Sequence, residues 1–199
     1  ARQGLAPVLD VARDPRWGRI EETFGEDPTL VSQFGMAYVQ GLQGDDLRQG
    51  VMATGKHFIG HSFSQGGLNC GPVPLGWHDL WETAMAPFEA AIREAGMATI
   101  MNAYPELDGE VVAASRQILT DLLREQLAFD GLVVADYDAV IMIHNFHKMV
   151  QTRKEAAIKA LTAGIDVELP TVACYGDDLL EAVQSGELSV DIVDLAVKR

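Results

Sequence analysis

The residues of this 199-residue chain best suited to chemistry are polar side chains at the ends of apolar runs. The most informative is Asp136, which follows the run Leu132–Ala135 and precedes Tyr137. In parallel α/β folds, catalytic groups lie at the carboxyl ends of strands, so Asp136 is a candidate nucleophile or general base. A helix N-cap is the alternative interpretation, because caps favour aspartate. Asp138 is the alternative nucleophile.

Four other apolar runs also end in polar residues, namely Asp10, Lys56-His57, Asn102 with Tyr104, and Asp166 with Glu168. Lysine and arginine side chains only donate hydrogen bonds, whereas aspartate carboxylates only accept them. Lys56 and Arg19 together with carboxylates can therefore hold the vicinal hydroxyl groups of a sugar. His57 would add a directed donor, and Trp17 or Tyr104 an apolar face.

Some of these residues have alternative interpretations. Arg19 could form a surface ion pair with Glu21 or Glu22. Lys56 could be a Schiff-base amine, which requires a depressed pKa. His57 and His61 have the i, i+4 spacing of a metal pair, but no third ligand is evident nearby, so no metal and no other cofactor is expected.

The composition excludes several classes of function. The net charge of −14 argues against binding to nucleic acids or anionic membranes, because phosphate binding requires clustered basic residues. No apolar stretch approaches the ~20 residues of a membrane helix. Cys70 and Cys174 form neither a disulfide framework nor a zinc motif. The chain begins at Ala1 with no initiator methionine, so we expect an internal piece of a longer protein, whose compartment is undetermined.

The candidate residues require an alternating α/β architecture to position them. Five β-rich runs are separated by amphipathic stretches, which predicts a parallel sheet with crossover helices. No nucleotide-binding glycine motif is present, and five strands are too few for a complete eight-stranded barrel. The predicted strands are Leu5–Val11, Val51–Phe58, Met97–Asn102, Leu132–Ala135 and Ile165–Leu169.

The predicted helices have recognisable boundaries. The first runs from Pro28 to Leu42 with Asp27 as N-cap, and Leu30, Val31, Phe34 and Tyr38 lie on one apolar face of it. The others are His78–Glu94, interrupted at Pro87; a helix from Ser115 with Ile118, Leu122, Leu123 and Leu127 inward; one from the capping box Thr152–Glu155 to Gly164; and Asp177–Gln184 and Val190–Lys198. The polar loop Gly60–Trp77 is expected to be a functional lid or poorly ordered.

Taken together, these segments resemble glycoside hydrolase family 3, the β-glucosidase and β-xylosidase group. The similarity spans essentially the whole chain in the correct order. The segments that carry it are Arg13–Arg19 followed by Glu21–Asp27, Gly55–Phe58, Met101–Tyr104, Gly131–Tyr137 and Ala163–Pro170.

The resemblance implies a role for each candidate residue. Asp136 matches the family's nucleophile, and Arg19, Lys56 and His57 match its ligands for the sugar hydroxyls. Tyr104 matches the tyrosine that packs against the bound sugar, and Met101, from the same segment, is expected among the substrate-binding residues.

The resemblance also implies what this chain lacks. We expect residues 1–199 to be a single incomplete (β/α)8 TIM-type barrel, without the first barrel strands and without the C-terminal α/β sandwich domain. In many relatives that domain supplies the acid/base glutamate, which no residue here matches. Leu68 replaces an arginine of many relatives, and the Asp-Ser-His loop of the single-domain N-acetylglucosaminidase branch is absent, which favours the two-domain branch.

The expected function is that of a retaining, exo-acting β-glycosidase that releases a non-reducing-end sugar from a small β-glucoside or an oligosaccharide. A β-xylosidase of the same family is the close alternative. A Schiff-base lyase or aldolase using Lys56, and a non-catalytic carbohydrate-binding remnant, are the alternatives from other classes. The fragment alone is expected to be inactive without the missing C-terminal domain of the same protein.

Overall fold

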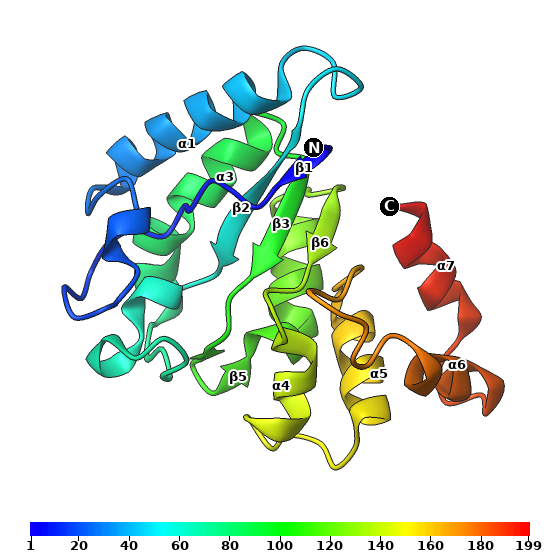
Figure 1. Ribbon diagram of the computed structural model, residues 1–199. Helices are drawn as coiled ribbons and strands as arrows, with labels where there is room; N and C mark the ends of the chain where they lie inside the picture. The colour runs from blue at the N-terminus through cyan, green and yellow to red at the C-terminus, as the bar shows by residue number, and fades with distance from the viewer. The chain divides into compact units, whose positions relative to one another are not determined.

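The computed structural model describes residues 1–199, which form two compact units, Ala1–Gly109 and Glu110–Arg199. In both units short strands alternate with helices, as Figure 1 shows. This alternation confirms the predicted α/β class.

Unit 1 contains the parallel strands β1 (Gln3–Gly4), β2 (Met52–Phe58) and β3 (Thr99–Asn102), with β2 between the other two. The predicted strand Leu5–Val11 is wrong: only Val8 bridges to β2, at Lys56. Pro7 has no N–H to donate to a ladder, which limits regular pairing in this segment. Leu9 nevertheless donates its N–H to the Lys56 carbonyl at 2.6 Å, so the segment still follows β2.

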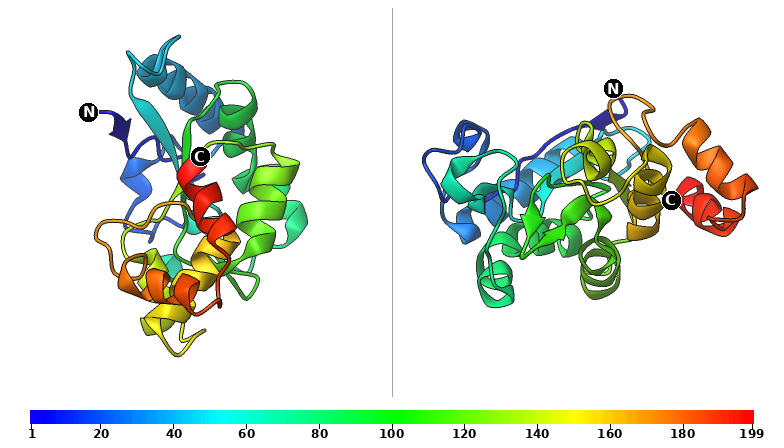
Figure 2. Two further views of the ribbon diagram at one scale, coloured as in Figure 1. Left: turned by 90° about the vertical axis from the view of Figure 1, so that its right-hand side faces the viewer. Right: turned by 90° about the horizontal axis from the view of Figure 1, so that it is seen from below.

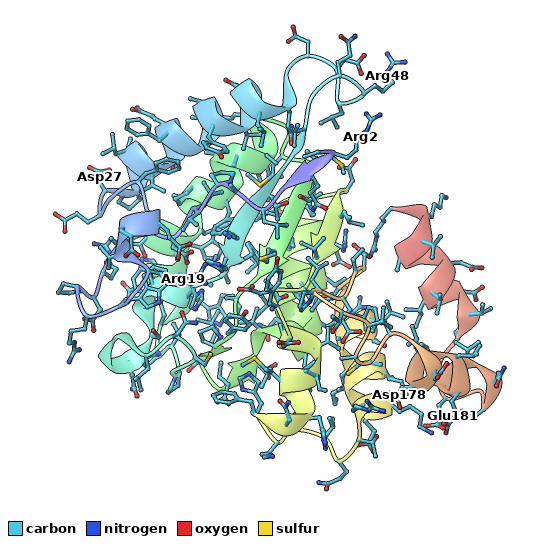
Figure 3. The ribbon with its side chains drawn as sticks, viewed as in Figure 1. Arg2, Arg19, Asp27, Arg48, Asp178 and Glu181 are labelled. Atoms are coloured by element: carbon cyan, nitrogen blue, oxygen red, sulfur yellow. The ribbon has the colours of Figure 1, made fainter.

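Helix α1 (Pro28–Gln43) begins as predicted. The Asp27 carboxylate, labelled in Figure 3, accepts the N–H groups of Thr29 and Leu30, and Pro28 occupies the first turn. Of the predicted apolar face only Val31 is buried. Its other members are exposed, and the buried residues are Val31, Gly35, Val39 and Gln43.

A small residue explains this orientation of α1. A Cβ atom on Gly35 would lie 2.5 Å from a methyl of buried Leu9, so the glycine permits close packing of the helix. The large apolar residues Leu30, Phe34 and Tyr38 stay outside, where Phe34 stacks on Phe24 at 5.5 Å.

The predicted helix His78–Glu94 is divided into three parts. They are α2 (Trp77–Asp79), the π-helical turn η4 (Leu80–Ala84) and α3 (Ala86–Arg93). The interruption precedes Pro87, which lies in the first turn of α3, where a missing N–H costs least. Helices α1 and α3 lie side by side in Figure 1.

Unit 2 begins with β5 (Glu110–Val111) and η5 (Val112–Ala114). It continues with the π-helical η6 (Gln117–Gln126), the strand β6 (Leu132–Val134), and the helices α4 (Ala139–Asn145), α5 (Arg153–Ala163), α6 (Asp177–Gln184) and α7 (Val190–Lys198). The predicted inward residues of the helix after Ser115 are all buried. The strand Ile165–Leu169 is reduced to one parallel bridge, between Val167 and Val134.

Helix α5 is the centre of packing in the C-terminal part of unit 2. It contacts α4, α6 and α7, as the two views of Figure 2 show. Its capping box is confirmed, since Thr152 and Glu155 exchange side-chain hydrogen bonds with each other's N–H groups. Lys154 bridges to Glu181 at 3.0 Å and Glu187 at 2.8 Å, which ties α5 to α6. None of the helices has the length and apolar character to cross a membrane.

Candidate active site

An irregularity in β2 places Lys56 and His57. The pairing of β2 with β3 shifts by one residue between Gly55 and Phe58, so Lys56 and His57 lie in a bulge. Bulges redirect side chains and are common beside active sites. Here, near the carboxyl end of β2, Lys56 is half-buried and His57 is fully buried.

Asp10 holds His57 through two hydrogen bonds. One Asp10 oxygen, Oδ2, accepts the main-chain N–H of His57 at 2.9 Å and lies 2.8 Å from ring atom Nδ1. Burial alone would raise the pKa of Asp10, but the charge and hydrogen bonds of His57 outweigh it and leave this pKa below its ordinary value. An ionised Asp10 therefore keeps a proton on Nδ1 and fixes the orientation of the ring.

His61 is the centre of a buried ring cluster. Its ring centroid lies 4.6 Å from that of His57, 5.1 Å from Trp17 and 5.7 Å from Tyr104. Nε2 of His61 lies 2.7 Å from the Asn69 carbonyl oxygen, an acceptor, so Nε2 carries the proton. Burial lowers the pKa of His61 to about 4, which keeps the ring neutral at pH 7.

The loop Gly60–Trp77 is held in place by this cluster and by main-chain pairing. Trp17 donates from Nε1 to the Asn69 side chain at 3.3 Å, and Val73 bridges to Leu107 in β4 (Glu106–Leu107). Two short 3₁₀ turns, η2 (His61–Phe63) and η3 (Gln65–Gly67), form within it. These contacts give the loop a defined conformation, and its role as a lid stays a prediction. Trp17 is buried, so it is a packing residue and no open platform for a sugar.

Arg19, labelled in Figure 3, forms a bidentate ion pair with Glu22 of η1 (Ile20–Glu22). Its Nε and Nη2 donate to the two carboxylate oxygens at 2.7 and 2.9 Å. The hydrogen bond from Arg19 lowers the pKa of Glu22, and the charges of Lys56 and His57 lower it further. This is the ion pair given above as the alternative interpretation of Arg19, and Glu22 also lies within electrostatic range of Lys56 and His57.

The two remaining predicted site residues in unit 1 differ in exposure. Tyr104 is half-buried, and its ring packs against His61. Met101 lies within β3 and is fully buried, so its contact with a sugar stays a prediction.

Asp10 also supplies the third group that the sequence did not reveal beside the two histidines. One potential ligand atom from each of Asp10, His57 and His61 lies within 4.8 Å of the others. The 2.8 Å contact between Asp10 and His57 is the length of a charge-assisted hydrogen bond, which accounts for the proximity of these two residues without an ion.

In unit 2, Asp136 follows β6 and is 7% exposed. Its Oδ1 accepts the N–H of Tyr137 at 2.7 Å, and its carbonyl accepts the N–H of Ala139, the first residue of α4. Asp138, at positive φ (64°), is the residue at the N-cap position, but it makes no side-chain cap hydrogen bond. The N-cap interpretation of Asp136 is therefore wrong.

Two other acidic residues of unit 2 are engaged in the protein's own contacts. Asp166 is enclosed by Arg124 Nη2 at 2.6 Å, Arg199 Nη1 at 2.8 Å and the N–H of Val133 at 2.8 Å. The Glu168 carboxylate accepts main-chain N–H groups. Neither carboxylate is an open sugar ligand, although the sequence placed both at a strand end.

The whole chain, residues 1–199, matches the glycosyl hydrolase family 3 N-terminal domain. A β-xylosidase of Formosa agariphila is 41% identical over 82% of this chain and 23% of its own length. A xylan 1,4-β-xylosidase of Xylanibacter ruminicola is 38% identical over 97% of this chain, and a periplasmic β-glucosidase of Salmonella typhimurium is 32% identical over 97%. The chain spans about a quarter of the length of these relatives.

Solved structures of β-glucosidases superpose closely on this chain. A β-glucosidase of Erythrobacter marinus superposes with a TM-score of 0.94 at 39% identity, over 99% of this chain and 27% of that one. A β-glucosidase of Listeria innocua in complex with glucose gives a TM-score of 0.91 at 36% identity, over 97% of this chain and 27% of that one. These neighbours confirm the predicted partial (β/α)8 barrel. The chain belongs to glycosyl hydrolase family 3.

Proposed function

We propose that the protein is a retaining, exo-acting β-glycosidase in which Asp136 is the nucleophile. The observation that carries the proposal is the placement of Asp136 at the carboxyl end of a parallel strand, nearly buried, with a main-chain N–H directed at one carboxylate oxygen. Membership of a glycosidase family supports it. The proposal extends to the longer protein, because this chain covers about a quarter of its relatives.

In the proposed first step, an Asp136 carboxylate oxygen attacks the anomeric carbon, and the glycosidic C–O bond breaks. An acid outside these 199 residues protonates the leaving oxygen. Water, deprotonated by the same group, then releases the sugar from Asp136, and the configuration is retained. The N–H of Tyr137 stabilises the negative charge on Oδ1 before attack.

Unit 1 supplies the proposed sugar-binding groups. Arg19 and Lys56 present positive charge around Glu22, so this group of side chains offers both donors and an acceptor to sugar hydroxyls. Asp10 holds Nδ1 of the His57 ring, so the other ring nitrogen, Nε2, points in a fixed direction. Tyr104 is the proposed aromatic contact, and Met101 is retained as a candidate from the same segment.

The missing parts of the barrel and a C-terminal domain are proposed to come from the longer protein. We propose that residues 1–199 are one incomplete barrel domain, that the acid/base lies outside it, and that no cofactor is required. The β-glucosidase assignment is preferred, but β-xylosidase is a specific second candidate because the relatives at 41% and 38% identity are named β-xylosidases. Family membership favours the β-glucosidase and β-xylosidase assignments over a Schiff-base enzyme that uses Lys56. Borohydride trapping with a carbonyl substrate would reveal a modified Lys56 in such an enzyme.

The test uses the complete protein and a 2-deoxy-2-fluoro-β-glucoside with a 2,4-dinitrophenyl leaving group. Peptide mapping by mass spectrometry is expected to find the fluorosugar on Asp136, and Asp136→Asn is expected to lower kcat by about 10³-fold or more. Asp138→Asn is the matched control. Labelling of another residue, or full activity in the Asp136 variant, would overturn the assignment. The kcat/KM values for aryl β-glucosides and β-xylosides decide between the two sugars.

A further inference from the structure

The carboxylate of Glu168 is surrounded by main-chain N–H groups of the residues that follow it. Oε2 accepts from Ala173 at 3.0 Å, Cys174 at 2.9 Å and Tyr175 at 2.8 Å, and Oε1 accepts from Cys174 at 3.1 Å. Glu168 is only 8% exposed. A buried carboxylate with these donors anchors the backbone of the segment in one conformation.

Two titratable groups, the Cys174 thiol and the Tyr175 hydroxyl, lie beside Glu168. Burial and the charge of Glu168 raise the pKa of the Cys174 thiol to about 12. The pKa of the Tyr175 hydroxyl is raised by burial and by Glu168 in the same way. Both groups therefore stay neutral beside the carboxylate.

The segment that carries Glu168 is joined directly to the segment that carries Asp136. Val167 bridges in parallel to Val134, and the Val167 carbonyl accepts the N–H of Ala135 at 2.8 Å. The carbonyl of Leu169 accepts the N–H of Asp138 at 2.9 Å. Since the pairing is parallel, the residues after Glu168 emerge at the same end as Asp136.

The loop after Glu168 has a fixed base and an exposed tip. Cys174 is buried, and the Tyr175 hydroxyl donates to the Ile165 carbonyl at 2.9 Å. Pro170 and Thr171 are exposed, and Val172 is 72% exposed. An exposed apolar tip at the catalytic end of a strand pair is suited to contact a substrate.

We propose that Glu168 is a positioning residue: its carboxylate fixes the loop Pro170–Tyr175, and the exposed tip of this loop forms part of the wall that discriminates between substrates at Asp136. The inference rests on the proposed role of Asp136. Glu168 itself acts through the main chain and does not touch the reacting atoms.

The first experiment is Glu168→Gln in the complete protein. The amide keeps the shape of the side chain but directs a donor group at main-chain donors, so the loop loses part of its anchor. Active sites are counted by titration with the fluorosugar reagent, and kcat is expressed per labelled site. We expect kcat per site to fall by about tenfold or more, since small displacements near the chemistry reduce rate strongly. We also expect the ratio of kcat/KM for aryl β-glucoside and β-xyloside to change.

Glu181→Gln is the matched control. It is the same substitution in the same unit, at a side chain that is 67% exposed and paired with Lys154. It is expected to leave kcat per site and the substrate ratio unchanged. A merely structural role for Glu168 would lower the number of active sites or the Tm but leave kcat per site and the ratio at wild-type values, which would overturn the proposal.

Val172→Ala provides a second test that does not depend on the folding of the Glu168 variant. Because this side chain is largely exposed, its truncation leaves the core intact, and we expect the substrate ratio to shift by about threefold or more. An unchanged ratio in Val172→Ala contradicts the proposed contact of the tip. If the wild-type protein carries no fluorosugar on Asp136, the proposed function fails. If the wild type is labelled on Asp136 but Glu168→Gln and Val172→Ala behave like the wild type, only the inference about Glu168 fails.

Discussion

At the residue scale, the main feature of unit 1 is a set of buried polar groups that hold one another. Asp10 fixes His57, and His61 contacts the rings of His57, Trp17 and Tyr104. The contacts of Asp10 with His57 and of His61 with the Asn69 carbonyl are short, at 2.8 and 2.7 Å. They matter because a buried polar group without a partner is costly. These contacts fix the orientation of His57, one of the proposed sugar ligands.

The neutral state of His61 predicts a pH dependence of stability. Its pKa falls from 6.5 to about 4 on folding, so between these values the unfolded chain binds more protons than the folded one. The stability contributed by neutral His61 is complete above pH 6.5 and is lost as the pH falls towards 4, by about 3 kcal/mol in total. Urea unfolding measured between pH 7 and pH 4 checks this.

The matched comparison is His61→Gln against His78→Gln. His61→Gln is expected to flatten the pH profile of the free energy of unfolding, whereas His78, whose side chain is 94% exposed, is expected to have no influence on it. Equal pH profiles for the wild type and His61→Gln would contradict the prediction.

At the element scale, positioning depends on close approach between segments that are distant in sequence. Gly35 brings α1 against Leu9, and Gly67 brings the loop Gly60–Trp77 against the backbone of Arg16 and Trp17. In both places a small residue, which carries no hydrophobic signal, determines which surfaces meet.

The loop glycines allow a paired test of this approach. Gly66 and Gly67 both have positive φ, at 67° and 71°, but a Cβ on Gly67 would lie 2.7 Å from backbone atoms of Arg16 and Trp17, while a Cβ on Gly66 meets nothing within 4 Å. Gly66→Ala should cost about 1 kcal/mol for its backbone conformation alone. Gly67→Ala should cost more and raise KM for aryl β-glucosides. Identical stability and kinetics of the two variants would exclude the close approach.

The ion network of Asp166 gives a second prediction at this scale. Arg124 and Arg199 both form ion pairs with the Asp166 carboxylate, and the Asp166 side chain is 1% exposed. Asp166→Ala leaves a buried guanidinium uncompensated and should lower the free energy of unfolding by about 3 kcal/mol. Asp121→Ala, which removes an exposed partner of Arg116, should cost less than about 1 kcal/mol. Comparable losses in chemical denaturation would argue against the network.

At the scale of the whole molecule, the proposed catalytic groups are divided between this chain and the rest of a longer protein. The chain spans about a quarter of its relatives, and the acid/base is proposed to lie outside it. A general acid contributes about 10²–10⁴-fold to such reactions. The proposed division of roles therefore places nucleophile and sugar ligands here and the proton donor elsewhere.

This division predicts that the isolated 199-residue chain does not turn over 4-nitrophenyl β-glucoside or β-xyloside at a measurable rate. The complete protein, assayed at the same molar concentration, is the control and should release 4-nitrophenol. Turnover by the isolated chain that disappears in Asp136→Asn would show that the chain contains its own acid/base, and it would refute the proposed division.

Local patterns in the sequence predicted several elements of the fold. Asp27 with Pro28 and the Thr152–Glu155 box defined two helix starts, because capping depends on residues within one turn. The order of motifs identified the family and, with it, the fold. The residue types at strand ends indicated sugar chemistry, although Asp166 and Glu168 serve the protein's own contacts.

The tertiary structure alone decided which of these groups work together. Asp10 and His57 are 47 residues apart in the sequence. The Glu168 carboxylate accepts main-chain N–H groups, which leave no pattern in the sequence. The inward face of α1 was decided by Gly35 and not by its large apolar residues. The sequence by itself determined the order, the ends and the chemical types of the elements, since these follow from local backbone preference. Partnership between distant side chains depends on how surfaces pack, and packing is a property of the folded chain.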